Sequence, residues 1–302
     1  MTNRIGLAFH ETFSLSRPAI GQMLSTIPQA PQKGSLEKHF REHTALGTRY
    51  IKSMPRYATG AGLLDFDRRL TLFGQYALNH DRLLEHQGTQ WLMHYYLSAP
   101  QGPGPAFWHD LVSKCFYAGH EFSKTQVERQ IATFVERMEG RALVERTIRS
   151  TATIFLGTYC KSDGLGRLGL LNQLDDKHYR VEEPVSPPVW AVARATCARR
   201  TRVRRVYRVE EPVSPPVWAV AYALLDYWAV QFQEQLTVSL DTLTAPGGFT
   251  TLFLMGQQDF NEVLRALQAE RYIEVYRTAP PYQVVLLRRD SEPLLQKLYG
   301  AN

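Results

Sequence analysis

Cysteine is scarce in this sequence, and its spacing is informative. Cys115, Cys160 and Cys197 are the only cysteines in the chain of 302 residues, and none of them belongs to a CxxC pair. This spacing excludes a zinc ribbon, and sparse cysteine is typical of a protein from the reducing cytosol.

Long apolar runs are also missing. The most apolar stretch, 217–232, contains Asp226 and is shorter than the roughly 20 residues that a membrane-spanning helix needs. Residues 1–30 lack the basic start and apolar centre of a secretion signal. We therefore expect a cytoplasmic protein that does not enter the membrane.

Two patterns that suggest cofactor or metal binding are incomplete. Residues 164–169 match GxGxxG, but a helical pattern precedes them where a dinucleotide site needs a strand, so a linker is the simpler interpretation. His39 and His43 stand four residues apart, which suits a metal, but no third ligand or HExxH motif accompanies them. The sequence predicts no metal site and no cofactor.

Acid–base pairs are equally isolated. His10 with Glu11 and His120 with Glu121 are the pairs that catalysis would use, and nothing in the sequence places a nucleophile beside either. Walker loops and nucleophile elbows are absent. We expect a non-enzymatic protein with no catalytic residue.

Basic charge is concentrated in one repeated segment. Residues 179–193 and 207–221 both read YRVEEPVSPPVWAVA, an offset of 28 residues. Segment 194–221 holds seven arginines and two glutamates, a net charge of +5, so the rest of the +6 chain sums to only +1. The simpler interpretation of two identical copies is a recent duplication or an error in the gene sequence, since stacked repeats need about three diverged copies.

The arginines between the copies support a second interpretation. Guanidinium groups bind phosphate through paired hydrogen bonds, so this segment is a candidate nucleic-acid-binding site. Copy two leads into an apolar helical pattern with Pro216 near its first position, so we expect copy two in the core and copy one nearer the surface. The candidate phosphate-binding residues are Arg199, Arg200, Arg202, Arg204 and Arg205.

The sequence pattern of the whole chain predicts helices joined by short hairpins. Helix, turn, helix and hairpin follow one another at 35–78, where Ser35 is a candidate helix cap. Helix, turn and helix follow at 122–160, where Ser123 is a second cap, and helix, hairpin and helix follow at 257–302. We divide the chain into an N-terminal strap plus winged helix-turn-helix, a helical second helix-turn-helix unit, a linker with the duplicated segment and a core helix, and a C-terminal winged-helix-like unit. These parts span 1–100, 101–162, 163–232 and 233–302.

Four details of this interpretation are specific enough to test. Pro55 is expected to end or kink its helix, and residues 236–248 are expected to form a loop. The helix after Phe122 is expected to bury one face, which includes Val127 and Met138. The aromatic residues of 85–118 are expected to lie inside a helical hairpin rather than in a ligand cage.

Basic residues at the start of predicted second helices indicate DNA contact. A recognition helix presents its N-terminal residues to the major groove, and a wing meets phosphate. A solvated helix face explains the same spacing without DNA. The candidate contacts are Thr48, Arg49, Lys52 and Arg56 on the first such helix, Arg68 and Arg69 on the wing that follows, and Arg146 and Arg149 on the helix of the second unit.

An opening box and several later segments together match a family pattern. Residues 9–24 read FHETFSLSRPAIGQML, and LGTRYIKSMPRYATGAGLLD, LTLFGQYAL, WLMHYYLSAP and PPVWAVAYALLDYW follow along the chain. From about residue 8 to 300 the sequence resembles the bacterial domain-of-unknown-function family 4007. That family typically opens with the box matched here by His10, Glu11, Thr12, Phe13 and Arg17.

The resemblance implies a biological setting rather than an activity. Such proteins tend to be encoded beside enzymes resembling PAPS reductases in DNA phosphorothioation and related phage-defence clusters. The family pattern runs directly from the linker into PP-x-x-x-AYALLD, so segment 194–221 looks like an addition in this chain.

We therefore expect a mainly α protein, a helical bundle of tandem helix-turn-helix or winged-helix units with short β-hairpin wings. Its expected role is a non-enzymatic DNA-binding or adaptor subunit of a bacterial DNA modification or phage-defence system, with double-stranded DNA and other subunits as partners. One alternative is a scaffold that recruits a sulfotransfer or nuclease partner through an exposed aromatic patch without binding DNA. A second is a metal- or nucleotide-dependent enzyme that uses His39 and His43 or the 164–169 loop.

Overall fold

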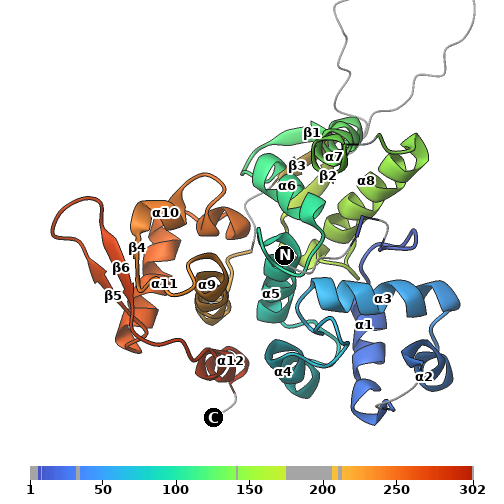
Figure 1. Cartoon of the computed structure of the whole chain (residues 1–302), viewed down its shortest axis with the longest axis horizontal. Helices are drawn as coiled ribbons and strands as arrows, with labels where there is room; N and C mark the ends of the chain where they lie inside the picture. The colour runs from blue at the N-terminus through green and yellow to red at the C-terminus, as the bar shows by residue number, and fades with distance from the viewer. Residues whose placement is uncertain are drawn as a thin grey trace, which may run out of the picture.

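Helices dominate the computed structural model, and two small antiparallel sheets complete it (Figure 1). No helix in the part of the chain that the structure describes is long and apolar enough to cross a membrane. The structure describes residues 6–7, 9–31, 35–140, 142–174, 206–209 and 213–300.

The N-terminal part is a strap followed by four helices. Ser35 caps the second helix by accepting a hydrogen bond from the Lys38 backbone, as its sequence predicts. An isolated antiparallel bridge between Leu64 and Leu70 forms the short hairpin. The helices are α1 (Arg17–Leu24), α2 (Leu36–His43), α3 (Thr48–Gly60) and α4 (Leu72–His80), and a 3-10 turn spans Ile27–Gln29.

Pro55 lies inside α3, so the helix does not end at the proline. Proline costs a helix interior about 3 kcal/mol because it removes one hydrogen bond and crowds the preceding turn. Ile51, Met54 and Tyr57 are fully buried on the same helix, and α3 packs against α1. Burial of each large apolar side chain contributes about 1.5–3 kcal/mol, which together outweighs the cost of the proline.

A middle part places a three-stranded sheet beside its helices. Its strand order is β1-β3-β2, with both pairs antiparallel. Ser123 and Gln126 form a complete capping box at the start of α7, as predicted. The elements are α5 (Gln87–Ser98), α6 (Ala106–Cys115), β1 (Glu121–Ser123), α7 (Lys124–Glu139), α8 (Glu145–Cys160), a 3-10 turn (Gly166–Leu168), β2 (Leu171–Leu174) and β3 (Val206–Val209).

The C-terminal part repeats this arrangement with a second sheet of order β4-β6-β5. Residues 236–248 are not a simple loop, because they hold a strand and a short helix capped by Ser239. Leu240 and Leu243 are buried and anchor this segment in the core. Two apolar residues are too few to show a helical period in the sequence. The elements are α9 (Val217–Gln231), β4 (Thr237–Ser239), α10 (Leu240–Thr244), a 3-10 turn (Phe249–Phe253), α11 (Gln257–Ala269), β5 (Ile273–Tyr276), β6 (Gln283–Leu286) and α12 (Glu292–Tyr299).

Copy two of the repeated segment forms core structure, as its sequence predicts. Its start is strand β3, where Tyr207 and Val209 are buried, and its end opens α9. Leu174 of β2 pairs with Val206 of β3, so residues 175–205 connect two neighbouring strands. Copy one and its predicted surface position lie in that connection, outside the described residues.

Most aromatic residues of 85–118 lie in the core, whereas Tyr117 is exposed. Trp91 and Trp108 are fully buried, and His94 lies between the hydroxyl of Tyr159 at 2.8 Å and the Leu252 carbonyl at 2.7 Å. Helix α5 packs against α9, and Figure 1 shows it where the N-terminal helices meet the C-terminal part. The helix α7 prediction fails at one position, since Met138 is 62% exposed near the end of the helix.

Candidate nucleic-acid interface

Helix α3 presents basic residues to solvent at its N-terminal end. Arg49 and Lys52 are exposed, while Ile51 and Met54 face the core. The alternation follows from the helical period, because residues three apart share a face and their neighbours point inward. Thr48 is exposed as the first residue of the helix, so the predicted groove-facing positions do lie on the surface.

Arg56 is also exposed but already has a partner. Its guanidinium lies 3.3 Å from a carboxylate oxygen of Glu11 and 3.4 Å from the Phe9 carbonyl. Both members of the ion pair keep more than a third of their side-chain surface exposed, so the pair contributes little stability and can exchange for a phosphate. Arg56 therefore joins the strap to α3 as well as adding charge to this face.

Arg68 and Arg69 lie apart from the start of α3. They belong to the hairpin that follows the last residue of α3, and a helix of 13 residues spans roughly 20 Å. The Asp65 carboxylate accepts a hydrogen bond of 2.8 Å from the Arg69 backbone, and Asp67 adds a second acid to the hairpin. The hairpin is thus less basic than its arginines alone indicate.

Helix α8 carries the second basic face. Arg146 and Arg149 are exposed near its N-terminus, and Arg149 forms an ion pair with Glu145 one turn earlier. The N-terminal ends of α3 and α8 lie on the same side of Figure 1, remote from α9–α12.

The opening box of the sequence holds these two helices together. A ring nitrogen of His10 lies 3.2 Å from the Thr151 hydroxyl on α8, and the Tyr57 hydroxyl of α3 donates to the Phe13 carbonyl at 2.9 Å. Burial lowers the pKa of His10 to about 4, because desolvation disfavours the charged ring. The neutral ring suits a structural hydrogen bond between the strap and α8.

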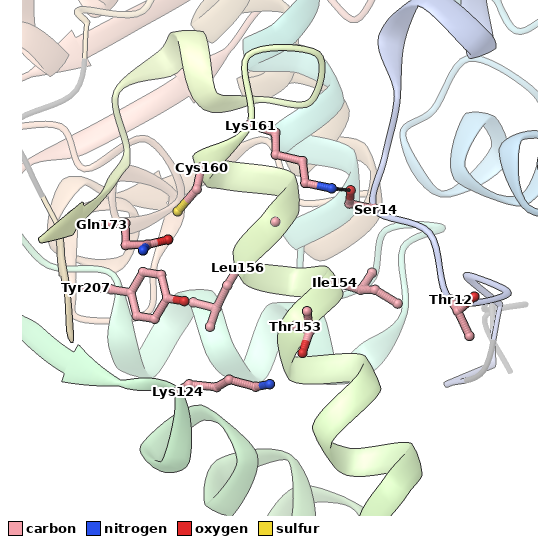
Figure 2. Close-up of a pocket in the computed structure, with 11 residues that line it drawn as sticks. Thr12, Ser14, Lys124, Thr153, Ile154, Leu156, Cys160, Lys161, Gln173 and Tyr207 are labelled. Atoms are coloured by element: carbon pink, nitrogen blue, oxygen red, sulfur yellow. Dashed lines mark hydrogen bonds between the residues drawn. The ribbon is translucent and has the colours of Figure 1, made fainter. Parts of the chain in front are cut away.

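The same face of α8 continues from its arginines into a cavity of about 220 Å³ (Figure 2). Arg149, Thr153, Gly157 and Lys161 follow at intervals of four, which places them in one row. The cavity opens beside this row, between the strap, the start of α7 and strands β2 and β3. It is lined by Thr12, Ser14, Lys124, Thr153, Ile154, Leu156, Gly157, Cys160, Lys161, Gln173 and Tyr207.

Sequence reasoning missed this cavity. The side of the cavity that α8 provides could have been found from the four-residue spacing that runs from Arg149 to Lys161. That spacing continues the predicted basic face of the helix. The other side comes from the strap and from β3, more than 100 residues away from one another along the chain. Their meeting depends on tertiary packing, which no local pattern specifies.

The inserted arginines and the paired histidines are further candidate sites in the sequence. Arg199, Arg200, Arg202, Arg204 and Arg205 lie outside the described residues. The His39 ring bonds the Thr26 carbonyl at 2.9 Å and the His43 ring bonds the His39 carbonyl at 2.9 Å. Within the described ranges, no three His, Cys, Asp or Glu side chains are grouped to hold a metal ion.

The glycines of the 164–169 loop have a packing reason. A Cβ at Gly164 would stand 2.5 Å from the Thr158 carbonyl oxygen, and one at Gly166 would stand 2.5 Å from that of Lys161. The loop therefore needs glycine to turn tightly over the end of α8.

These features define a mainly α-helical protein with small antiparallel sheets, in which α3 and α8 each expose basic residues near their N-termini. The chain belongs to the family of proteins of unknown function DUF4007, whose model matches residues 7–299. No curated protein matches the chain.

Two solved structures share the fold. A magnesium-bound crystal structure of SspB has a TM-score of 0.72 with 16% sequence identity and covers 99% of this chain and 89% of SspB. A second SspB crystal structure has a TM-score of 0.71, also with 16% identity and the same coverage. At this identity the likeness concerns the fold alone.

Proposed function

We propose that this chain is a non-enzymatic DNA-binding or adaptor subunit of a bacterial DNA modification or phage-defence system of the phosphorothioation type, acting in the cytoplasm. Family membership supports the setting, and the exposed basic face supports the ligand. The observation that carries the proposal is the pair Arg49 and Lys52, one turn apart at the exposed start of α3.

The order of elements supports the proposed use of α3 and α8. Helices and strands follow as helix, strand, helix, helix, strand, strand in α6–β1–α7–α8–β2–β3 and again in α9–β4–α10–α11–β5–β6. In both sheets the last strand pairs with the other two. We interpret both as winged helix-turn-helix units, and the first part, with its shorter hairpin, as a reduced one.

Charge distinguishes the three second helices of these units. Helix α3 exposes Arg49 and Lys52, which form no ion pair within the described part of the chain. Helix α11 instead exposes Asp259 and Glu262 in its first two turns, which repel phosphate. We therefore assign DNA contact to α3 and α8 rather than to α11.

Fluorescence anisotropy with a labelled duplex tests the proposal. Each lysine or arginine that neutralises a phosphate adds about 0.9 to the salt slope of binding to B-DNA. Arg49→Ala combined with Lys52→Ala is expected to weaken binding and to lower the slope by about 1–2. The matched control is Arg265→Ala with Arg289→Ala, which removes two exposed charges from the C-terminal part. Unchanged affinity in the first double variant would contradict the assignment.

Burial of the aromatic segment removes the exposed patch that the scaffold alternative requires. Trp91, Tyr95, Phe107 and Trp108 are buried, so the aromatic segment does not present a patch to a partner, although Tyr117 is 55% exposed. A chain that binds no duplex at low salt but co-purifies with partner enzymes would still favour that alternative.

A further inference from the structure

The cavity beside α8 is rich in hydrogen-bond donors. The Lys161 ammonium donates to the Ser14 hydroxyl at 3.0 Å, which leaves two of its protons and the serine proton for a ligand. Figure 2 shows Lys124 at the other end of the cavity from Lys161 and Ser14, with Thr153 and Leu156 between them, and Gln173 and Thr12 add further polar groups.

No carboxylate belongs to the side chains that line the cavity. Lys124 has an acid nearby, since Glu128 lies 3.7 Å from its ammonium one turn along α7, but that long pair can be exchanged for a ligand. A lysine at each end of a lining without carboxylates creates a positive potential, which favours an anion. Hydroxyls and an amide provide directed donors, which favour an anion with several oxygens.

The size of the cavity narrows the choice of anion. About 220 Å³ is below the roughly 300–1,000 Å³ of pockets for drug-sized ligands. It is about seven times the ~30 Å³ that one water occupies in the liquid, so a phosphoryl group fits together with bridging waters. Ile154 and Leu156 add apolar side chains to the lining.

The strap adopts an unusual backbone at the rim of this cavity. Glu11 and Thr12 have φ values of 46° and 72°, and the left-handed region is unfavourable for a branched residue such as threonine. The Thr12 backbone is held there by a hydrogen bond of 3.1 Å to the ring of His10. Strain that neighbouring contacts maintain is typical of functional sites, and here it positions Thr12 beside the cavity.

We infer that this cavity is a binding site for a phosphoryl group, held at one end by Lys161 and Ser14, with Lys124 adding positive charge at the other end. The group comes either from the DNA backbone, which would follow the row of side chains from Arg149 to Lys161, or from a free phosphate ester. The backbone source rests on the DNA binding proposed above, whereas the free source does not.

Calorimetric titration of the full chain with inorganic phosphate at fixed ionic strength tests the site. A single saturable site is expected, with affinity reduced about tenfold or more in Lys161→Met, because a charge-assisted hydrogen bond is lost. Ser14→Ala should weaken binding less, and Lys38→Met, which removes an exposed lysine on α2, should leave it unchanged. A duplex titration of Lys161→Met across salt is run in parallel, with an expected fall of about 0.9 in slope if the backbone enters the cavity.

The two arms separate the sources. Phosphate binding that depends on Lys161, with no change for duplex, identifies a free phosphate ester as the ligand. A reduced slope for duplex identifies the backbone. If Lys161→Met lowers neither the phosphate affinity nor the salt slope of duplex binding, while circular dichroism shows a folded protein, the site is overturned. Unchanged duplex binding in the Arg49→Ala, Lys52→Ala variant would contradict the DNA proposal alone and would leave the phosphate result untouched.

Discussion

Arg17 and Gly164 are joined by a hydrogen bond of 2.6 Å, from the Arg17 Nε to the glycine carbonyl, across 147 residues of chain. The same buried guanidinium donates to the carbonyls of Leu84 at 2.7 Å and Ser162 at 2.6 Å. One side chain thus ties the first helix to the loops that precede α5 and follow α8. This geometry gives the arginine of the opening box a structural role.

Replacing Arg17 by lysine should destabilise the protein. A single ammonium cannot reproduce the planar fork, so buried carbonyls lose their donors, and each hydrogen bond to a charged group contributes about 1.5–3 kcal/mol. We expect Arg17→Lys to lower the free energy of unfolding by about 2–4 kcal/mol in urea denaturation. Arg265→Lys, at an exposed position of α11, serves as the control and should change it by less than about 0.5 kcal/mol.

Stability should fall in mild acid because of His94. Burial lowers the pKa of this histidine from 6.5 to about 4. Between these values the unfolded chain binds more protons than the folded one, so the free energy of unfolding decreases as the pH drops through this window. From pH 7.5 to 5 the expected loss is about 2 kcal/mol.

Urea denaturation of His94→Gln at both pH values isolates this contribution. The variant should be less stable overall, because the bonds to Tyr159 and Leu252 are disturbed. Its stability should nevertheless depend on pH by about 2 kcal/mol less than that of the parent. An identical dependence in both proteins would mean that His94 is not the titrating group.

The carboxylate of Asp226 depends on tyrosine hydroxyls. Tyr95 donates to it at 2.8 Å and Tyr96 at 3.1 Å, across the contact between α5 and α9. Burial raises the pKa of Asp226, and these two hydrogen bonds partly offset that rise. Tyr95→Phe should therefore lower the free energy of unfolding by about 1–3 kcal/mol at neutral pH. Tyr76→Phe removes a hydroxyl bonded to exposed Glu292 and should have a smaller effect, which thermal melts can compare.

Deleting residues 194–221 should preserve the fold. Because the copies are identical, the deletion leaves one complete copy, with His178 at the position of Val206 and only residues 175–177 between β2 and β3. Connections of three residues suit antiparallel strands. Loop-closure entropy then predicts a gain of up to about 2 kcal/mol in the free energy of unfolding, since the connection shortens about tenfold. An unfolded deletion variant would show that the inserted segment is part of the core.

The sequence was most informative where a local signal coincided with tertiary packing. Ser35 and Ser123 begin helices as predicted, because a capping side chain satisfies backbone groups whatever surrounds the helix. Pro55 does not end its helix, because its local cost is smaller than the stabilisation from burial of its neighbours. Strand β4 was missed because three residues carry too little alternation to be recognised before their partner strand is known.

The candidate site was predictable only in part. Arg49, Lys52 and Arg146 are exposed as the helical period required. The partners of Arg56 and Arg149 were not visible, because Glu11 lies in a strap with no regular period and the Glu145 pair depends on where α8 begins. The cavity around Lys161 needed the fold itself, since β3 and the strap converge there from distant parts of the chain.

DNA binding by the basic residues of α3 and α8 has to be separated from DNA binding by the inserted arginines. We would therefore measure duplex anisotropy across a salt series in the chain lacking 194–221, with and without Arg49→Ala and Lys52→Ala. Binding that persists after the deletion, with a slope lower by about 1–2 in the double variant, is the predicted result. Binding that disappears with the deletion alone would show that the arginine segment holds the DNA and would contradict the account.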